Sequence, residues 1–551
     1  MLSRHRNLAV EQSLQTLCGE IAGRSSVAGA CECGEGVYSA RPESPDLLLI
    51  VEDYTDGLRY HTRRIDAQLV TVLAADKSLV ELDARKGAMG EFIVERLLTP
   101  FRPLRNPDLL RSIEVDTKER ILREELAELT LEYGEMAREL SVQEEYLILA
   151  RIRKRARIFL SAARTCALLL EPSVRDANLR EMAPGYQCAI SRLIDTGVLR
   201  KEDSGYAIED SFVDHTLSRK STAKVINIVA AGRRALQAYL AHGRAAYLTP
   251  DVLTKELVSS LELSLLSDVQ SQDLEDPRKY LSLKTVTGQV SLAERFSIEK
   301  LAGRFRPGAI VTVSPLGNVL NEVYLISAGD ERLVAKKFTE WQSFKWFTLG
   351  LVSLGTRHFS VSGKARLENE YAVNRLLSKR GVRVPEILHV SVPDRVLLER
   401  YVEGSSLVDL VKEAVSSKSM PEQSLAVAFK LGSTLAKIHG SGVVVGDTKP
   451  ENFQRSVDDE VYSLDLEQAG KSGDKAWDVA ELLYYSGHYV FPAVPSGGFK
   501  EYVNAFIQGY RKHGDENVLR TAAGVRYGRV FSLWTPPLAI REVSKALKGA
   551  A

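Results

Sequence analysis

The segment spanning residues 443–453 constrains the fold and chemistry of this chain more than any other. It reads Val-Val-Val-Gly-Asp447-Thr-Lys449-Pro-Glu-Asn452-Phe, an apolar run that ends in an aspartate, with a lysine two positions later and an asparagine five positions later. A second apolar run, Val-Tyr-Ser-Leu-Asp465-Leu, brings another aspartate thirteen residues after that asparagine. Apolar, branched runs of this length predict two buried strands. We therefore expect two strands to present these four polar side chains to a single site.

The four side chains match the requirements of phosphoryl transfer. That reaction needs a carboxylate to orient the attacking hydroxyl and a cation to face the γ-phosphate. It also needs hard oxygen ligands that hold a divalent cation between the phosphates. We predict that Asp447 orients the hydroxyl, that Lys449 stabilises the moving phosphoryl group, and that Asn452 and Asp465 bind the metal. ATP and either Mg²⁺ or Mn²⁺ are the expected cofactors.

This segment resembles the catalytic loop of protein kinases, which runs H-R-D-x-K-x-x-N and is followed by D-F-G. Val445 and Gly446 take the histidine and arginine positions, and the later triplet reads Asp465-Leu-Glu467. The Val-Gly-Asp form is most similar to the atypical kinases, namely the RIO kinases and the kinase subunit of the KEOPS tRNA-modification complex. The resemblance covers residues 305–490. It implies a bilobal kinase fold and transfer from ATP to a serine or threonine of a protein.

The resemblance implies a nucleotide-binding lysine upstream, on the strand that reads Leu333-Val-Ala-Lys336-Lys337. Side chains alternate across a strand, so only one of the two lysines faces the nucleotide. The placement in RIO kinases favours Lys336, whereas strict V-A-I-K spacing favours Lys337. Glu370, on the next helix, is expected to pair with the inward lysine, and Glu368 is the alternative.

Two further segments follow the order of the family. Residues 397–404, Leu-Leu-Glu-Arg-Tyr-Val-Glu-Gly, resemble the hinge between the lobes, where Glu399 and Tyr401 are expected to contact the nucleotide. The run Lys475-Ala-Trp-Asp478 resembles the helix that closes the core of the large lobe. We interpret His439, just before the catalytic segment, as a packing or hydrogen-bonding support.

Two features of the sequence bear on regulation. Only 12 residues separate Asp465 from Asp478, which is too few for a long activation loop. Gly446 stands where regulated kinases carry the arginine that binds a phosphorylated loop. We therefore predict control by a partner or by the N-terminal domains and not by loop phosphorylation.

Lys449 indicates the class of acceptor. Antibiotic and choline phosphotransferases resemble this fold, but they usually begin the loop with H-G-D and lack a lysine two residues later. A lysine there is typical of protein serine/threonine kinases, so a protein substrate is expected. A small-molecule phosphotransferase and an RNA- or ribosome-associated ATPase of kinase fold are the alternatives.

Residues 1–105 resemble the nucleotidyltransferase fold, in which a Gly-Ser turn precedes D-h-D on a strand and a third carboxylate lies on a neighbouring strand. Asp46 begins such a strand, but Leu48 takes the second acidic position. Asp83 is the candidate third carboxylate, and the glycine turn is spread over residues 28–36. Two-metal chemistry needs paired carboxylates, so we predict a degenerate, scaffolding domain and keep active nucleotidyl transfer as the alternative. The expected strands are residues 45–51, 68–74 and 78–82.

The middle of the chain is predicted to be mainly helical. Residues 106–171 form a helical domain in which an acid-rich stretch, 119–145, precedes a basic one, 151–157. The five basic residues are Arg151, Arg153, Lys154, Arg155 and Arg157. We predict two helices with complementary charged faces, and an RNA-binding patch is the alternative. The basic stretch 151–157 is also the reason to consider an RNA-, tRNA- or ribosome-related partner.

Residues 172–216 have the helix-then-hairpin order of a winged helix, with a turn at Ser204-Gly205. Its helix, 186–196, offers few side chains that could read bases, so no specific DNA binding is expected. Residues 217–290 are predicted to be a helical segment that ends in a linker over 266–290. Residues 291–551 form the protein-kinase-like domain.

Length and composition set the remaining bounds. A chain of 551 residues exceeds one ordinary domain, and these segments predict a multidomain α+β protein. Lys+Arg total 73 and Asp+Glu 72, which excludes a strongly basic nucleic-acid coat. No apolar run reaches the roughly 18–20 residues of a membrane helix, so no membrane partner is expected. Five unevenly spaced cysteines favour a reducing cytoplasm over a disulfide framework, and a zinc site at Cys31 and Cys33 is the alternative.

Overall fold

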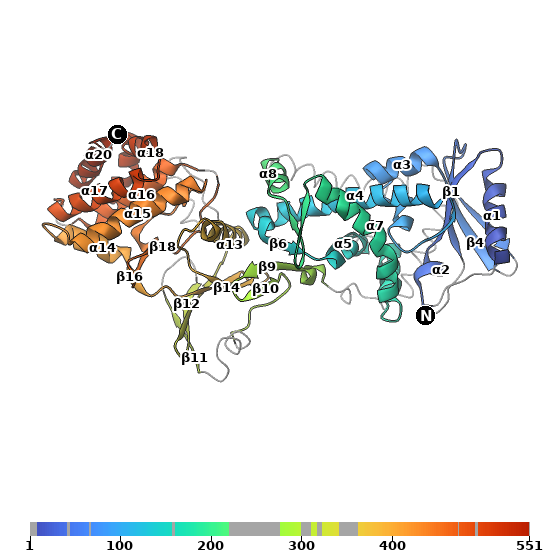
Figure 1. The fold of residues 1–551 in the computed structure, drawn as a ribbon, viewed down its shortest axis with the longest axis horizontal. Helices are drawn as coiled ribbons and strands as arrows, with labels where there is room; N and C mark the ends of the chain where they lie inside the picture. The colour runs from blue at the N-terminus through green and yellow to red at the C-terminus, as the bar shows by residue number, and fades with distance from the viewer. Residues whose placement is uncertain are drawn as a thin grey trace. The chain divides into compact units, whose positions relative to one another are not determined.

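The computed structural model describes residues 8–40, 45–65, 68–156, 160–219, 276–298, 310–316, 322–340, 362–471, 473–490 and 494–549. The helical segment predicted over 217–265, the first part of the linker predicted over 266–290, and the basic residue Arg157 therefore fall largely outside the described residues. The chain divides into two compact units. The first contains residues 1–132 and 140–282, and the second contains residues 133–139 and 283–551 (Figure 1).

The first unit begins with a five-stranded sheet in the order β3-β4-β2-β1-β5. Its strands are β1 (Val27–Cys33), β2 (Asp46–Val51), β3 (Leu58–Ile65), β4 (Gln68–Asp76) and β5 (Arg102–Arg105). β2 and β4 are parallel, and the other neighbours are antiparallel. The predicted strands at 45–51 and 68–74 are thus β2 and β4.

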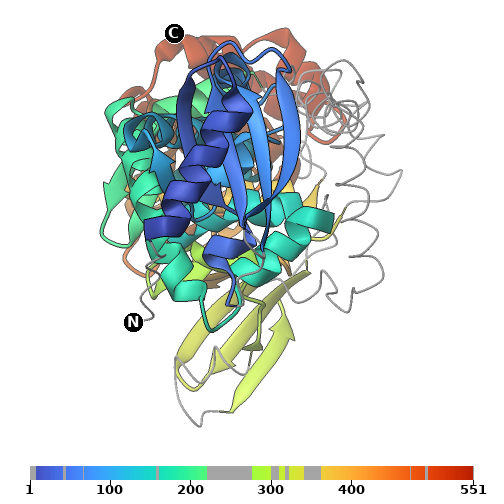
Figure 2. The ribbon, with the colours of Figure 1, turned by 90° about the vertical axis from the view of Figure 1, so that its right-hand side faces the viewer.

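Helices cover both faces of this sheet because β2 presents apolar side chains to each of them. Leu47 and Leu49 pack in one cluster with α1 (Leu8–Ala22), which lies across the sheet in Figure 2. Leu48 and Ile50 belong to the opposite cluster, with α3 (Lys77–Lys86) and η1 (Val94–Leu97). The short helix α2 (Glu35–Tyr38) joins β1 to β2. A strand with both faces buried reads as a continuous apolar run, as this one does.

The predicted strand at 78–82 is wrong, because these residues lie in α3. The Asp76 side chain accepts a hydrogen bond from Ser78 N at 2.9 Å and caps the helix. Val80 and Ala84, one helical turn apart, face the core. Cap and spacing together favour a helix over a strand.

Helices dominate the rest of the first unit. They are α4 (Pro107–Tyr133), α5 (Glu144–Ala156), α6 (Leu160–Leu169), α7 (Arg175–Asp195) and α8 (Asp210–Ser218). Three short strands, β6 (Leu140–Val142), β7 (Leu199–Glu202) and β8 (Gly205–Ile208), are arranged in the order β6-β8-β7. The helix predicted over 186–196 is the second half of α7, and the expected hairpin turn joins β7 to β8.

Residues 276–290, the second part of the predicted linker, are ordered structure. They form the turn η3 (Pro277–Tyr280), β9 (Leu281–Thr285) and most of β10 (Gly288–Ser291). The Asp276 side chain caps η3 through Arg278 N at 3.0 Å. The polar composition that suggested a linker reflects exposed strand positions such as Gly288 and Gln289.

The second unit contains an antiparallel sheet in the order β11-β12-β13-β15-β14. Its strands are β11 (Val311–Pro315), β12 (Glu322–Ala328), β13 (Glu331–Lys337), β14 (Ile387–Ser391) and β15 (Val396–Arg400). The helix α13 (Gly363–Lys379) lies between β13 and β14 in sequence. Leu333, Ala335 and Leu398 pack in a small apolar cluster of this sheet.

The remainder of the second unit is mainly helical (Figure 1). Its helices pack around an extensive apolar core. Its helices are α14 (Leu407–Ser416), α15 (Glu422–Gly440), α16 (Lys475–Ser486), α17 (Gly497–Arg511), α18 (Glu516–Ala522), α19 (Val525–Phe531) and α20 (Pro537–Gly549), with the turns η4 (Pro450–Asn452) and η5 (Gly487–Tyr489). A small sheet joins β16 (Gly404–Ser406), β17 (Phe453–Ser456) and β18 (Val461–Ser463). α15 and α17 approach so closely that a Cβ on Gly432 would lie 2.0 Å from Phe506 O.

Within the described parts of both units, no helix has the length and apolar character needed to cross a membrane.

Candidate functional site

A buried lysine on β13 is the centre of the candidate site. Lys336 Nζ lies 2.7 Å from Glu370 Oε1, on α13, and 3.0 Å from Glu399 Oε2, on β15. The strand register explains this meeting, since Lys336 pairs with Leu397 and Val334 pairs with Glu399. Lys336 and Glu399 are therefore diagonal neighbours on one face of the sheet. The Lys336 side chain is 12% exposed.

The neighbouring lysine points elsewhere. The Lys337 side chain is 49% exposed and pairs with Glu322, its register partner on β12, at 2.9 Å. Glu368, the alternative partner on α13, lies 3.8 Å from Lys364. Of the alternatives that the sequence left open, the structure brings together Lys336 and Glu370.

Glu370 and Lys336 also hold the backbone on both sides of Asp465. Lys336 Nζ donates to Leu464 O at 2.5 Å. Leu466 N donates to Glu370 Oε2 at 2.6 Å. Because one carboxylate binds both the lysine and this backbone, the position of α13 determines the position of Asp465.

The cluster has an excess of negative charge, since one ammonium group faces three carboxylates. Burial alone would lower the pKa of Lys336, but the carboxylates of Glu370, Glu399 and Asp465 raise it above its ordinary value. Burial raises the pKa of each of these carboxyl groups, and Lys336 opposes the increase only in part. Such a cluster gains stability from an added cation.

The segment 443–453, which the sequence identifies as the candidate catalytic loop, precedes Asp465 in the chain. Its aspartate and its lysine form an ion pair. Lys449 Nζ is 2.8 Å from Asp447 Oδ1. Asn452 Nδ2 donates to Asp447 O at 2.9 Å. Burial opposes the charged form of Lys449, but Asp447 and Glu481 raise its pKa above the ordinary value.

The expectation that a strand leads into Asp447 is wrong. Val443, Val444 and Val445 are buried, but they form a loop with a single bridge between Val444 and Gly470. Gly446 has φ +89°, a conformation that a strand residue with a side chain rarely adopts. The second run does contain a strand, β18, which ends two residues before Asp465.

Acidic side chains from α16 hold this loop from the interior. Asp478 accepts hydrogen bonds from Val445 N at 2.7 Å and Gly446 N at 2.8 Å. Glu481 accepts one from Thr448 N at 2.8 Å. Each carboxylate therefore fixes the backbone within two residues of Asp447, in a region where unpaired N–H groups are costly.

His439 supports the same arrangement. Its Nε2 lies 3.0 Å from Asp478 Oδ2, and its Nδ1 lies 2.6 Å from Tyr510 Oη. The histidine is thus a buried hydrogen-bonding bridge between α16 and α17, as its sequence position suggested. It is 3% exposed.

Sequence reasoning missed the part that Glu481 plays, and it gave Asp478 no contact with the loop. The signal was present, because acidic residues three positions apart on a largely apolar helix share one face. It also missed Arg366, which is fully buried on α13 and lies 3.0 Å from Glu467. The ion pair of Arg366 with Glu467 is a second contact between α13 and the residues after Asp465, in addition to that of Glu370 with Leu466 N. No local sequence pattern predicts it.

The two expected hinge residues differ in placement. The Glu399 side chain is 2% exposed and faces Lys336, so it belongs to the charged cluster. Tyr401 lies just beyond β15, where its backbone N–H donates to Arg332 O at 3.0 Å. The Arg332 guanidinium sits 4.8 Å from the centre of the Tyr401 ring.

The oxygen atoms available near the cluster suit a hard divalent cation. Asn452 uses its amide nitrogen for Asp447 O, which leaves an amide oxygen as the ligand atom, and Asp465 supplies a carboxylate. Among the residues that the structure describes, no group of three or more His, Cys, Asp or Glu side chains is placed to hold a metal ion by itself. A cation held by Asn452 and Asp465 would complete its shell with phosphate oxygens and water, as Mg²⁺ commonly does.

The residues expected to form a metal site at the N-terminal sheet do not form a carboxylate pair on β2. Gly34, at φ +76°, follows β1 and precedes α2, and it lies so close to Asp46 that a Cβ there would be 2.9 Å from Asp46 Oδ2. The position two residues on is Leu48, which is fully buried and pairs with Leu73 on β4. The strand next to β2 therefore offers an apolar side chain opposite this position.

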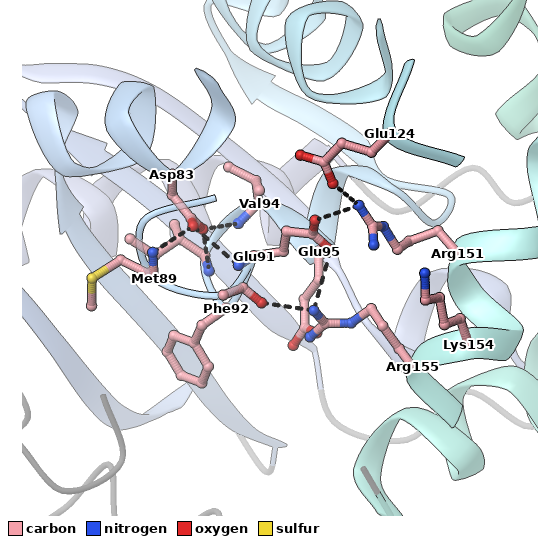
Figure 3. Close-up of polar contacts among 12 residues, drawn as sticks. Asp83, Met89, Glu91, Phe92, Val94, Glu95, Glu124, Arg151, Lys154 and Arg155 are labelled. Atoms are coloured by element: carbon pink, nitrogen blue, oxygen red, sulfur yellow. Dashed lines mark hydrogen bonds and ion pairs between the residues drawn. The ribbon is translucent and has the colours of Figure 1, made fainter. Parts of the chain in front are cut away.

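Asp83, the expected third carboxylate, is instead a buried structural acceptor on α3 (Figure 3). Its Oδ1 accepts from Met89 N and Glu91 N, at 2.9 and 3.1 Å. Its Oδ2 accepts from Ile93 N and Val94 N, at 3.1 and 3.3 Å. Both oxygens hold the loop after α3, which corrects the assignment of Asp83 to a metal site on a strand.

The basic run on α5 is largely committed to carboxylates (Figure 3). Arg151, 6% exposed, contacts Glu91 at 3.2 Å and Glu125 at 3.3 Å, and it also pairs with Glu124. Lys154 pairs with Glu128. The remaining pairs join Arg155 to Glu91 and Glu95, and Arg120 to Glu91 and Glu124. The contacts with Glu124, Glu125 and Glu128 join α5 to α4, as expected for two helices with complementary charges, whereas those with Glu91 and Glu95 join α5 to η1 and the residues before it.

Cys31 and Cys33, the alternative zinc ligands, are both buried in the apolar cluster beneath β2. Burial is the main cause that raises the pKa of Cys33 to about 12, which disfavours the thiolate that zinc requires.

The sheet with its lysine, the helix that supplies Glu370 and the loop from Asp447 to Asp465 define a kinase-like domain. Residues 312–489 match the family model described as "APH: Phosphotransferase enzyme family". The C-terminal region therefore contains a domain of kinase-like fold that is similar to this phosphotransferase family.

Two curated relatives match parts of the chain. One is "KEOPS complex subunit Bud32" from Pyrococcus abyssi (strain GE5 / Orsay), 29% identical over 90 residues, which are 16% of this chain and 39% of that protein. The other is "Probable serine/threonine-protein kinase CPE1738" from Clostridium perfringens (strain 13 / Type A), 26% identical over 122 residues, which are 22% of this chain and 17% of that protein. The chain thus spans well under half the length of either relative.

Proposed function

We propose that this chain is an ATP-dependent kinase of the atypical type that transfers the γ-phosphoryl group to a serine or threonine hydroxyl of a protein, including its own. The observation that carries the proposal is the contact network at Asp465. Lys336 and Glu370 bind the backbone on either side of that aspartate, while Lys449 neutralises Asp447. The phosphotransferase family match and the two kinase-named relatives also support it.

Each group has a role in the proposed reaction. Lys336, held by Glu370, binds the α- and β-phosphates of ATP. Asp447 orients the acceptor hydroxyl and takes its proton as the hydroxyl oxygen bonds to the γ-phosphorus. The bond from that phosphorus to the bridging oxygen breaks, and ADP leaves with the electron pair. Lys449 offsets the charge on the transferred group.

The metal is assigned to Asn452 and Asp465. A bound Mg²⁺ or Mn²⁺ would neutralise the charge that develops between the β- and γ-phosphates. The raised pKa of Asp465, caused mainly by burial, fits a carboxylate that is stabilised once a cation binds. Glu399 would contribute through Lys336, and Tyr401 would lie near the base at the end of β15.

The proposal is tested by incubating the full chain with γ-labelled ATP and either metal, and by scoring transfer to itself, to added protein, to small alcohols and to water. Asp447→Asn is expected to lower transfer by about 10²–10⁴-fold, because the acceptor loses its base. Asp458→Asn changes an exposed aspartate in the turn between β17 and β18, and it is the matched control. Undiminished transfer by the Asp447 variant would contradict the proposal.

The acceptor is tested in the same experiment. A small-molecule acceptor is the second candidate, because the matched family model is described by phosphotransfer and not by a protein substrate. Label on small alcohols but not on protein would favour it. Label released only as phosphate would favour an ATPase, the third candidate, for which the paired basic residues of α5 give little support.

For residues 1–105 we propose a scaffolding version of the nucleotidyltransferase fold. Leu48 in the second acidic position and the structural role of Asp83 support this interpretation. Incubation with α-labelled nucleoside triphosphates is expected to leave no label on protein or RNA. Incorporation that depends on Asp46 would contradict it.

A further inference from the structure

The turn η2 (Gly134–Glu139) has an unusual place in the chain. It groups with the C-terminal unit, although the elements that flank it in sequence, α4 and β6, group with the N-terminal unit. α4 ends at Tyr133 and β6 begins at Leu140, so no loop separates the turn from either element. Met136 and Ala137 are fully buried, which shows that the turn is packed and not simply a surface connection.

η2 contacts α13 at both of its ends. Near the end of α13, Glu139 Oε2 lies 3.7 Å from Arg375 Nε, and Glu139 also pairs with Lys379. Near its start, Lys364 Nζ lies 4.8 Å from the centre of the Tyr133 ring, the residue just before the turn. The side chains of Glu139 and Arg375 are 11% and 20% exposed, so this ion pair is shielded from solvent more than an ordinary surface pair, whereas Lys379 is 55% exposed.

The same turn also contacts the segment that follows Asp465. Glu135 Oε2 lies 3.3 Å from Lys471 Nζ and 2.7 Å from Arg138 Nε. Lys471 is within the short stretch between Asp465 and the start of α16. One turn therefore binds both α13, which carries Glu370, and the chain just beyond the metal-binding aspartate.

These contacts have a direct consequence for the site. Glu370 on α13 holds Lys336 at 2.7 Å and the backbone of Leu466 at 2.6 Å. A shift of α13 would therefore move the lysine partner and Asp465 together. We propose that η2 is a positioning element for the phosphotransfer site, and that residues from the N-terminal half of the sequence set the transfer rate through Glu139 and Glu135.

This inference deepens the proposed function and rests on it. It is tested with the full chain by comparing the wild type, Glu139→Lys, Lys379→Glu and the double variant that exchanges the two charges. Each single variant is expected to lower kcat by about 3- to 30-fold, the range typical of coupling residues. The double variant is expected to recover most of the loss, which general destabilisation would not do.

A matched control is available in the same unit. Glu460→Lys breaks the Lys430–Glu460 ion pair, which has a separation of 2.7 Å and side chains 40% and 43% exposed. It is expected to leave kcat within about twofold of the wild type, since exposed pairs contribute little. Equal kcat in the wild type and Glu139→Lys would overturn the inference.

Hydrogen exchange separates failure of the inference from failure of the proposed function. Exchange in the peptides of Gly363–Lys379 does not require catalysis, and Glu139→Lys is expected to accelerate it whereas Glu460→Lys is not. If the wild type transfers no phosphoryl group, the proposed function fails and the exchange result alone decides whether η2 positions α13. Unchanged exchange in Glu139→Lys would overturn the inference.

Discussion

The two units each contain a buried cluster of charged side chains, and the clusters differ in balance. In the first unit, Arg151 and its basic neighbours on α5 face a comparable set of glutamates, and nearly every charge has an opposite partner. In the second unit, Lys336 faces three carboxylates, those of Glu370, Glu399 and Asp465. A balanced cluster leaves little buried charge without an opposite partner, whereas an unbalanced one retains negative charge that a bound cation would offset.

Lys336→Met should produce the largest change, because it removes an ammonium group that faces three carboxylates. We expect phosphoryl transfer to fall by about 10²–10³-fold. The free energy of unfolding of the C-terminal unit should fall by up to about 3–5 kcal/mol, measured by urea titration. Lys337→Met is the matched control, since the exposed neighbour should change transfer by less than about twofold. Similar losses in both variants would contradict the assignment of the inward lysine.

Arg151→Met should be the most damaging change in the balanced cluster. The loss leaves Glu91, Glu124 and Glu125 with less opposing charge, and we expect the N-terminal unit to lose about 3–5 kcal/mol of unfolding free energy. Lys154→Met, at a side chain 38% exposed, should cost no more than about 1 kcal/mol. Transfer per folded molecule should be unchanged in both, and a large loss of transfer would mean that this cluster acts on the phosphotransfer site.

Asp83→Asn should cost about 1–3 kcal/mol, since the amide nitrogen cannot accept the backbone N–H groups that one carboxylate oxygen now binds. The effect should depend on pH. Burial raises the pKa of Asp83, so the folded state binds this proton more tightly than the unfolded chain. Wild-type stability should therefore fall as pH rises from about 4 through the raised pKa, and the asparagine variant should lack that slope. Urea titrations across this range would reveal it, and parallel curves would contradict it.

The smallest expected effect is a change in the rate of cysteine labelling, which reports whether the first unit has opened. All five cysteines lie in residues 1–282, and Cys188 is exposed whereas Cys18, Cys31, Cys33 and Cys166 are buried. A thiol reagent should label Cys188 in the native protein and the other four only when the first unit opens. Labelling of the buried thiols should accelerate in Arg151→Met and not in Lys336→Met. Acceleration in both would show that the two clusters are coupled.

The sequence predicted the components of the kinase-like region better than their arrangement. The alternation of side chains along a strand predicted that only one of Lys336 and Lys337 faces the nucleotide. The register of β13 with β15 shows that Lys336 is the one on the same face as Glu399. Val443–Val445 has the composition of a strand, but Asp478 binds its backbone from α16, thirty-three residues from Val445. Local composition cannot indicate such a partner.

One missed local signal and several long-range contacts explain the other differences. The strand predicted at 78–82 overlooked the Asp76 cap, a local signal that favours a helix. The packing of η2 on α13 joins Glu139 to Lys379 across 240 positions of sequence, and no pattern within either segment predicts it. Asp83 matched the residue type of a metal ligand, but its four backbone donors belong to a loop whose conformation the sequence did not define.

The hydrogen bonds that Asp478 accepts from the loop beside Asp447 have a consequence for how such a protein could be redesigned. Because Val445 and Gly446 are held by hydrogen bonds from within the helical core, their positions do not depend on the ion pair between Lys449 and Asp447. Replacing exposed residues near Lys449, while Lys449 itself is kept, should therefore retarget the scaffold toward a different alcohol while Asp447 keeps its place.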